Sequence, residues 1–244
     1  MDWLTPEIVA LAATAATIGV VHTAIGPDHY LPFVMLSRAR RWSARWTAVV
    51  TLGCGLIHVV GSVLLGLIGV AAGLALRRLE IIESFRGDLA AWSLLAFGLM
   101  YLVWGLRRSR RSEAHSHWHT HADGVAHGHR HTHEGQHAHV HAERTGAGVT
   151  PWAMFLIFAF GPCEALIPVL MYPAAAANIA GLVFVTATFA LFTLTTMLVL
   201  VLAGYWTMSR AGHDSRVGGF LDQHAHAFAG AAISVCAGLM LVGL

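Results

Sequence analysis

The feature of this 244-residue chain that most limits its fold is a series of long apolar stretches. About twenty apolar residues are enough to cross a bilayer as one helix. We expect six such spans, at approximately residues 7–25 (with a continuation through a break to 37), 47–76, 89–106, 151–172, 179–205 and 225–244. The predicted fold class is therefore an all-α integral membrane protein with six transmembrane helices.

Composition excludes several other classes of protein. Charged residues are 11% of the chain and hydrophobic residues 56%, whereas soluble domains average nearer a quarter charged. A soluble single-domain enzyme is therefore excluded, and a net charge of +2 is too small for a nucleic-acid binder. The chain has no Lys and no Walker-type phosphate loop, so it does not hydrolyse ATP, and we expect no enzymatic activity.

Arginine placement predicts the orientation in the membrane. Twelve Arg fall in the predicted loops 38–46, 107–150 and 206–224, while the opposite side has only Arg77, Arg78 and Arg86. Because positive charge accumulates on the cytoplasmic side, we expect a multi-pass protein of the bacterial plasma (inner) membrane with both termini outside. Asp2 and Glu7 replace the basic start of a cleaved signal peptide, so the N-terminus is expected to join the first span.

Histidine dominates one predicted loop. Eleven of the 17 His lie between residues 115 and 141, among Gly, Ala, Asp and Glu and without apolar periodicity. Such a segment cannot bury a core, so we expect it to lack ordered structure without metal. Imidazole binds transition metals, which predicts an accessory metal-binding loop acting as buffer, sensor or donor. Its members are His115, His117, His119, His121, His127, His129, His131, His133, His137, His139 and His141.

The chain also contains an internal repeat. Gly26-Pro27 precedes Asp28-His29 in the first span, and Gly161-Pro162 precedes Cys163-Glu164 in the fourth. Each pair opens a half of three spans, so the halves are expected to have opposite orientation, as in inverted-repeat transporters. The predicted organisation is a first repeat over 1–106, a cytoplasmic His-rich loop over 107–150 and a second repeat over 151–244.

Both Gly-Pro pairs should break their helices. Pro lacks the backbone N–H and clashes with the preceding turn, while Gly removes side-chain restraint. We expect unwinding near 25–27 and 160–162, where exposed backbone is tolerated if it lines a cavity. Asp28 and Cys163 are then expected in the first turn of a new half-helix, where the dipole favours an anionic ligand.

Ionisable residues inside membrane spans are functional candidates. His22 lies seven residues before His29, which places both on one helical face. With Asp28 they suit a divalent first-row metal, and binding would displace protons. His58 is a fourth ligand or a supporting partner, Glu164 a ligand or proton relay, and Cys163 a thiolate ligand or packing residue. The repeat offset gives Thr193 the position in the fifth span that matches His58 in the second, as a pathway residue or a packing residue.

The motif His22-Thr-Ala-Ile-Gly-Pro-Asp28-His29 resembles the signature of the nickel/cobalt transporter (NicO) superfamily, whose best-known form has four residues between His and Asp-His. With five intervening residues and Gly-Pro, it looks like the urease-accessory-type nickel permease and sulfite-exporter-like branch. The second motif, residues 160–168, and the His-rich loop are similar to members of this group. The resemblance implies divalent-metal transport with His22, Asp28 and His29 at the metal site. Cys163 adds a softer candidate ligand, which would admit zinc, cadmium or copper.

The leading hypothesis is a secondary transporter of Ni²⁺ or Co²⁺, with Zn²⁺ or Cd²⁺ as further cargo and no prosthetic group. The expected partners are the bilayer, the metal ion and metallochaperone or urease-assembly proteins, with no nucleic acid. One alternative is a membrane thiol–disulfide carrier using Cys163. It needs a partner thiol, for which Cys54 is the candidate; otherwise Cys54 and Cys236 are expected to pack in apolar surroundings. Another alternative is a metal sensor or urease-assembly accessory protein.

Overall fold

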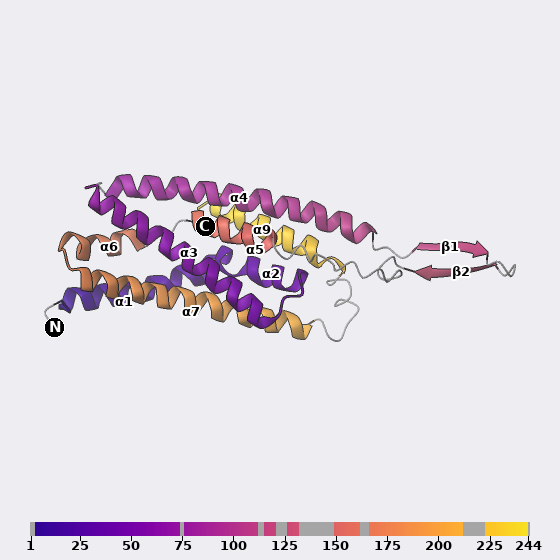
Figure 1. Ribbon diagram of the computed structural model, residues 1–244, viewed down its shortest axis with the longest axis horizontal. Coiled ribbons are helices and arrows are strands. Elements are labelled where there is room, and N and C mark those ends of the chain that lie inside the picture. The colour runs from indigo at the N-terminus through magenta and orange to yellow at the C-terminus, as the bar shows by residue number, and fades with distance from the viewer. Residues whose placement is uncertain are drawn as a thin grey trace.

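The structure is a computed structural model that describes residues 3–73, 76–111, 115–120, 126–131, 149–161, 166–211 and 223–243. Its elements, in chain order, are α1 (Pro6–Ile25), η1 (Pro27–His29), α2 (Leu31–Ala39), α3 (Ala44–Ala71), α4 (Leu76–Arg111), β1 (His115–Thr120), β2 (Ala126–His131), α5 (Val149–Phe160), α6 (Leu166–Ala175), α7 (Ile179–Ala211) and α9 (Ala225–Leu241). The helices form an elongated bundle (Figure 1).

Four helices are long and apolar enough to cross a membrane. They are α1, α3, α4 and α7, with a mean hydropathy between 1.8 and 2.2 over their most apolar windows. Their outer faces carry large exposed side chains such as Ile68 and Val183, an amount of apolar surface that soluble monomers rarely expose. The described helices therefore agree with the expected all-α, multi-span architecture. Because α5 and α9 are shorter apolar helices, six spans in two inverted repeats remain a prediction.

The first predicted helix break is confirmed. The helix α1 ends at Ile25, and the Gly26 N–H still donates to the His22 carbonyl oxygen at 3.0 Å. Pro27 then opens the short 3-10 turn η1, and α2 starts only at Leu31, just before Pro32. Asp28 consequently lies in the first turn after the break, as the sequence predicts, but this turn belongs to the short 3-10 helix η1 and not to the α-helix α2. The second proline sets a later start for α2 because its ring is favoured in a helix's first turn.

The second break also lies where the sequence predicts it. The helix α5 ends at Phe160, Gly161 follows outside the helix, and α6 begins at Leu166. Pro162, Cys163 and Glu164 lie outside the described residues.

The third predicted span begins too late. The expected loop before residue 89 is part of α4, which runs without interruption from Leu76 to Arg111. Its polar N-terminal part includes Glu83, which is completely buried and pairs with Arg86. Because the two opposite charges pair, this part of α4, which was predicted to be a solvent-exposed loop, packs inside the bundle.

The His-rich segment contains more order than predicted. Strands β1 and β2 pair antiparallel, with His115 opposite His131, His117 opposite His129 and His119 opposite His127. The absence of apolar periodicity led to the wrong expectation here, whereas the strict alternation of His with other residues matches the period of a strand. The remaining His of the segment, at 121, 133, 137, 139 and 141, lie outside the described residues.

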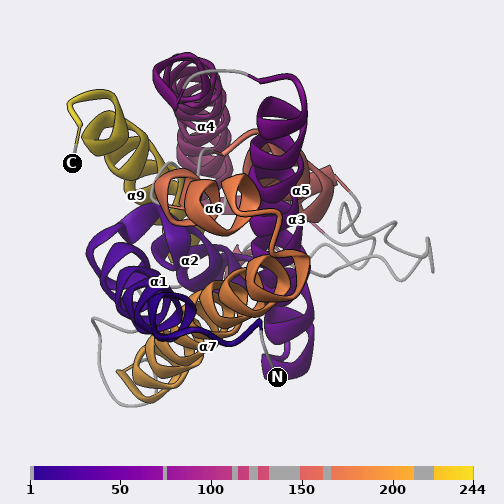
Figure 2. The same ribbon diagram turned by 90° about the vertical axis from the view of Figure 1, so that its left-hand side faces the viewer.

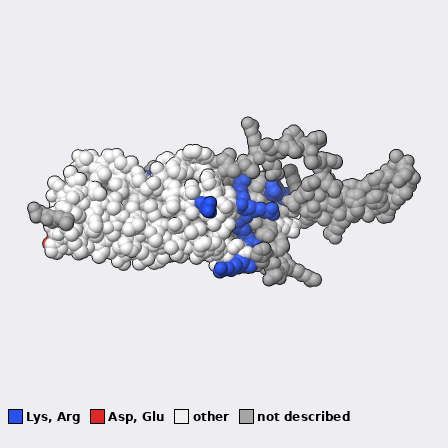
Figure 3. Space-filling model, turned by 60° about the horizontal axis from the view of Figure 1, so that its bottom comes forward, with Lys and Arg blue, Asp and Glu red and all other residues white. Residues whose placement is uncertain are grey.

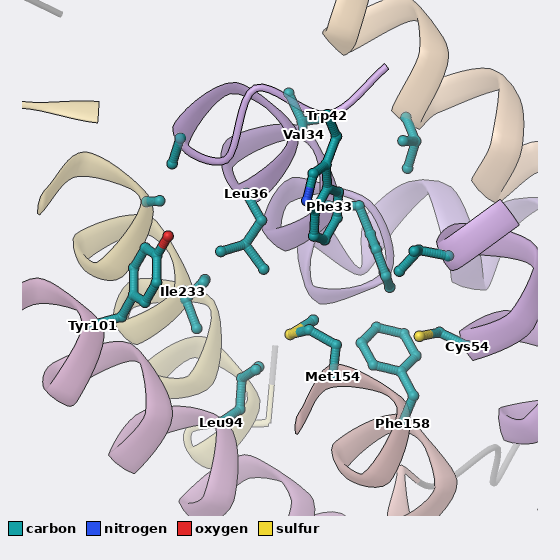
Figure 4. Close-up of a cluster of buried hydrophobic side chains, with 14 of the residues drawn as sticks. Phe33, Val34, Leu36, Trp42, Cys54, Leu94, Tyr101, Met154, Phe158 and Ile233 are labelled. Atoms are coloured by element: carbon teal, nitrogen blue, oxygen red, sulfur yellow. The ribbon is translucent and has the colours of Figure 1, made fainter. Parts of the chain in front are cut away.

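Contacts between the chain halves position the interior. The helix α4 packs along α9, and α1 packs along α7 (Figure 2). In the largest core cluster, Phe33 of α2 meets Phe158 of α5 with ring centroids 4.9 Å apart, and Met154, Leu94 and Ile233 surround them (Figure 4). The segment after the first break therefore packs directly against the helix before the second break.

Arginine side chains gather in a band across one end of the bundle (Figure 3). This end holds the last turns of α2, α4 and α7, and the hairpin β1–β2 projects beyond it (Figure 1). Arg40 lies 5.8 Å from the ring centroids of Tyr101 and Trp104, so the band also links α2 to α4. Beside the band the surface is mostly white, so few Lys, Arg, Asp or Glu residues lie there (Figure 3).

Candidate metal centre

Three histidines from three different elements meet inside the bundle. His22 comes from α1, His29 from η1 and His58 from α3, and each offers a ring nitrogen within 4.8 Å of the others. The ring centroids of His22 and His29 are 4.7 Å apart, and those of His29 and His58 are 5.4 Å apart. Both pairs are nearly perpendicular, so the nitrogens converge without stacking of the rings.

Buried ring nitrogens in this group lack hydrogen-bond partners among the described residues. They include Nε2 of His22, Nε2 of His29 and Nε2 of His58, while the His58 ring also approaches the Phe158 backbone. His29 and His58 are each only 4% exposed. An unsatisfied buried polar group costs about 1–3 kcal/mol, and a metal ion bound by these nitrogens would offset that cost. The His22, His29 and His58 group is therefore one that could hold a metal ion.

Asp28 supports His29 from the opposite side of its ring. The Asp28 Oδ2 atom lies 3.2 Å from His29 Nδ1, and the Gly26 carbonyl oxygen lies 3.3 Å from the same nitrogen. Two acceptors at Nδ1 favour the tautomer with its proton there, which leaves the Nε2 lone pair for a metal. Asp28, which the sequence predicts to be a ligand, therefore contacts the Nδ1 atom of His29.

The glycines of both Gly-Pro motifs lie against the histidines. A Cβ atom on Gly26 would lie 2.7 Å from His29 Nδ1 and 2.8 Å from Asp28 Oδ1. A Cβ atom on Gly161 would lie 2.9 Å from His58 Nδ1. Both positions therefore need the absence of a side chain, and the two predicted breaks are brought to one place by the fold. Pro27 lies in η1 beside Gly26, while Pro162 is not described.

His58 reaches the group through the buried face of α3. Thr51, Cys54 and Ser62 are buried on the same helix, at spacings that keep them on one side of it. The Phe158 ring lies 6.2 Å from the His58 ring, so α5 closes the space behind it. The sequence left open whether His58 is a metal ligand or a residue that supports the ligands. In the structure one of its ring nitrogens is among the three donor atoms that lie close together.

The sequence prediction missed Glu83 and Arg86. Arg86 was counted with a loop, yet its Nη1 donates to Glu83 Oε1 at 2.7 Å inside the bundle. The available signal was an acid and a base three residues apart, which places them on one helical face. Thr193, the predicted pathway residue, is 1% exposed, and its hydroxyl lacks a partner among the described residues.

Several other predicted site residues are not placed. Cys163 and Glu164 lie outside the described residues, and for the histidines of β1 and β2 the structure describes the backbone pairing alone. Cys54 and Cys236 are free and buried, each 1% exposed, as expected for packing residues.

Comparison with protein families, with curated proteins and with solved structures finds no match to this chain. The resemblance to nickel/cobalt transporters therefore stays an expectation from the two motifs.

The chemistry of the group follows from its donors. Three neutral imidazoles suit borderline divalent metals such as Ni²⁺, Co²⁺ and Zn²⁺. Structural zinc sites are almost always closed by four protein ligands, whereas three protein ligands leave a position for water or another group. The described residues bring three such ligands together.

Proposed function

We propose that this protein is a secondary transporter of a divalent transition-metal ion, with Ni²⁺ and Co²⁺ as the preferred cargo. The observation that carries the proposal is the convergence of His22, His29 and His58 within 4.8 Å beside a broken helix. The surrounding helices are long and apolar enough to cross a membrane.

A broken helix at the site favours transport over a static structural role. Interrupted helices that meet near the middle of the bilayer are a feature of secondary transporters. Non-helical backbone at membrane depth is tolerated where it is enclosed by protein or lines a wet cavity. Here the 3-10 turn η1 carries both His29 and Asp28, so a change in this turn would alter the ligand geometry directly.

The donor set supports a borderline metal. The converging atoms are ring nitrogens, which bind Ni²⁺, Co²⁺ and Zn²⁺ well, whereas softer ions prefer sulfur. We assign Asp28 the role of orienting His29, because its carboxylate lies at Nδ1 rather than beside Nε2. Cys163 and Glu164 follow Gly161 in the sequence, and Gly161 borders His58. They remain proposed further ligands, and Glu164 a proposed proton relay.

Proton exchange is a natural coupling for such a site. Imidazole must be unprotonated to bind a metal, so loading and release of the ion exchange protons. The band of arginines supports an orientation with its end of the bundle in the cytoplasm. In this proposal the His-rich segment lies on the cytoplasmic side of the plasma membrane and both termini lie outside.

Metal flux into proteoliposomes tests the proposal. Purified protein is reconstituted and supplied with Ni²⁺, Co²⁺, Zn²⁺ or Cd²⁺ under an imposed pH gradient. The variants are His58→Ala, which removes a converging ligand, and the control His226→Ala. His226 is hydrogen-bonded to Tyr101 at 2.8 Å and is not one of the three converging histidines.

We expect gradient-dependent flux in the unmodified protein and in His226→Ala. His58→Ala should lose metal affinity by more than the factor of about 10–100 typical of outer partners, and should carry no measurable flux. Tight binding without flux of any tested ion would contradict transport and favour the metal sensor or accessory role. Loss of thiol–disulfide exchange in Cys54→Ser/Cys163→Ser, with metal flux unchanged, would instead favour the thiol–disulfide carrier.

A further inference from the structure

The buried pair Glu83–Arg86 has no role in the metal centre as described so far. Arg86 Nη1 donates to Glu83 Oε1 at 2.7 Å, and the two side chains are 16% and 0% exposed. Both lie on α4 within the candidate membrane span Arg77–Ser109. Removing two charges from water is unfavourable unless their geometry and further hydrogen bonds are good, and ionisable residues at membrane depth are usually functional.

The other end of the Arg86 guanidinium holds the end of α5. Its Nη2 donates to the Ala159 carbonyl oxygen at 3.1 Å and to the Gly161 carbonyl oxygen at 3.5 Å. The last carbonyls of a helix have no intrahelical donor, and they form the negative end of its dipole. The partly buried Arg86 cation therefore stabilises the end of α5, at the second break.

The first break is held differently. The Gly26 N–H donates to the His22 carbonyl oxygen, and the His29 N–H donates to the Gly26 carbonyl oxygen at 3.1 Å. This break is closed by its own backbone turn. The second break has a backbone hydrogen bond from the Gly161 N–H to the Phe158 carbonyl oxygen at 3.2 Å, and the Arg86 side chain of α4 adds a contact from another helix.

Arg86 also packs against α3, the helix that carries His58. A Cβ atom on Gly61 would lie 3.2 Å from Arg86 Nη2 and 3.3 Å from the Ala159 carbonyl oxygen. Gly61 follows His58 by less than one helical turn. On the other side, Gly161 borders His58 Nδ1. The guanidinium thus links the two backbones between which the His58 ring is held.

We propose that Glu83 and Arg86 form a positioning clamp for His58: Glu83 fixes the guanidinium, and the guanidinium fixes the end of α5 against α3. The clamp sets the geometry with which His58 joins His22 and His29. This inference rests on the proposed metal site. It assigns Arg86 no contact with the ion, because its two donor groups point to Glu83 and to the end of α5.

The test compares Arg86→Gln, Arg86→Lys and the matched control Arg78→Gln in the full-length protein. Arg78 lies on the same helix and is exposed. Each protein is titrated with Co²⁺, and affinity and the visible absorption of the bound ion are recorded. We expect Arg86→Gln to lose about 10- to 100-fold in affinity, as for other partners that orient ligands, and to change the spectrum. Arg86→Lys keeps the charge and should partly restore the affinity and the spectrum. Arg78→Gln should have the affinity and spectrum of the unmodified protein.

If Arg86→Gln does not fold, two smaller substitutions on α3 replace it in the test. Gly61→Ala places a methyl group against the guanidinium, whereas Gly53→Ala on the same helix meets nothing within 4 Å. Only Gly61→Ala should shift the Co²⁺ spectrum. Unmodified spectrum and affinity in folded Arg86→Gln, or in Gly61→Ala when Arg86→Gln does not fold, would overturn the clamp.

A measurement without metal separates the clamp from the proposed function. In protein labelled with ¹⁵N-histidine, the His58 ring resonances should move in Gly61→Ala and stay in Gly53→Ala, whether or not the protein transports any ion. Absence of Co²⁺ binding by the unmodified protein would contradict the metal site alone. Unmoved His58 resonances in Gly61→Ala would contradict the clamp alone.

Discussion

At the scale of single residues, the backbone and carboxylate around the 3-10 turn decide how His29 is presented. Its Nδ1 faces the Asp28 carboxylate at 3.2 Å and the Gly26 carbonyl oxygen at 3.3 Å. Both acceptors favour the tautomer with its proton on Nδ1, which leaves the Nε2 lone pair for a metal. A carboxylate behind a ligating histidine also makes the ring a better donor.

Replacing the carboxylate should weaken metal binding without abolishing the site. We expect Asp28→Asn to lower Co²⁺ affinity about 10- to 100-fold, because an amide holds the His29 tautomer less strongly. Competition with a coloured chelator measures the affinity. The control is Glu80→Gln, an exposed acid on α4, which should leave the affinity unchanged. An unaltered affinity in Asp28→Asn would show that Asp28 does not orient His29.

Gly26 is the residue with the least room beside the site. Gly26→Ala would place a methyl group 2.7 Å from His29 Nδ1, so the imidazole must move. We expect a loss of Co²⁺ affinity and a changed absorption spectrum, with little change in the helices seen by circular dichroism. The same substitution at Gly53, where nothing lies within 4 Å, should change neither. Equal behaviour of the two variants would contradict the packing of Gly26 against the ring.

At the scale of elements, small residues let α4 and α9 approach closely. A Cβ atom on Gly230 would meet the backbone of Leu102 and lie 2.8 Å from the Gly98 carbonyl oxygen. A Cβ atom on Gly98 would lie 2.7 Å from Ser234 Oγ. Small residues that allow backbone contact are a general means of helix association in membranes. This contact places α9 beside the long helix that carries Arg86.

Overfilling this contact should destabilise the bundle. Gly230→Ala must separate the two backbones, and overpacking of this kind typically costs about 1–3 kcal/mol. We expect a lower thermal midpoint for the detergent-solubilised protein. Gly238→Ala on the same helix meets nothing within 4 Å and should leave the midpoint unchanged or raise it slightly. A midpoint for Gly230→Ala equal to that of Gly238→Ala would show that the close approach is not needed.

At the scale of the whole molecule, the two histidine-rich parts are separate. His22, His29 and His58 lie between helices of the bundle, whereas β1 and β2 project beyond the end that carries the arginine band (Figure 1). The two parts share no residue. Their metal-binding properties should therefore be independent, and the arginine band should determine on which side the hairpin lies.

Deletion of residues 115–141 tests that independence. We expect the number of metal ions bound per chain at saturation to fall, because eleven histidines are removed. The affinity of the remaining site should stay at the unmodified value, and adding His58→Ala should then remove it. Metal analysis after dialysis measures the number bound. Loss of all binding upon the deletion alone would contradict a separate site in the bundle.

The orientation can be checked with protease. The arginine in β2, Arg130, is a trypsin site in the projecting segment. We expect cleavage there in inside-out membrane vesicles and protection in intact spheroplasts, because the arginine-rich end is predicted to be cytoplasmic. Mass spectrometry of the fragments identifies the cut. Cleavage in intact spheroplasts with protection in inverted vesicles would reverse the predicted orientation.

Much of this architecture is determined locally and could be predicted from the sequence. Apolar length defines the long helices, and Gly26-Pro27 breaks the first one because proline removes a helical hydrogen bond. His22 and His29 lie seven residues apart on either side of this break, and the short turn η1 brings their rings to 4.7 Å from each other. These features depend on residues within about two helical turns of one another, so the sequence alone predicts them.

Other features depend on contacts between distant segments, and only the tertiary structure decided them. His58 joins the centre because α3 packs against the end of α5, where Gly161 leaves room for the ring. The long α4 was not predicted because the charges of Glu83 and Arg86 indicate solvent exposure until their 2.7 Å pairing is known. The cost of burying a charge depends on its partners, and for Arg86 those include carbonyls more than seventy residues away in sequence.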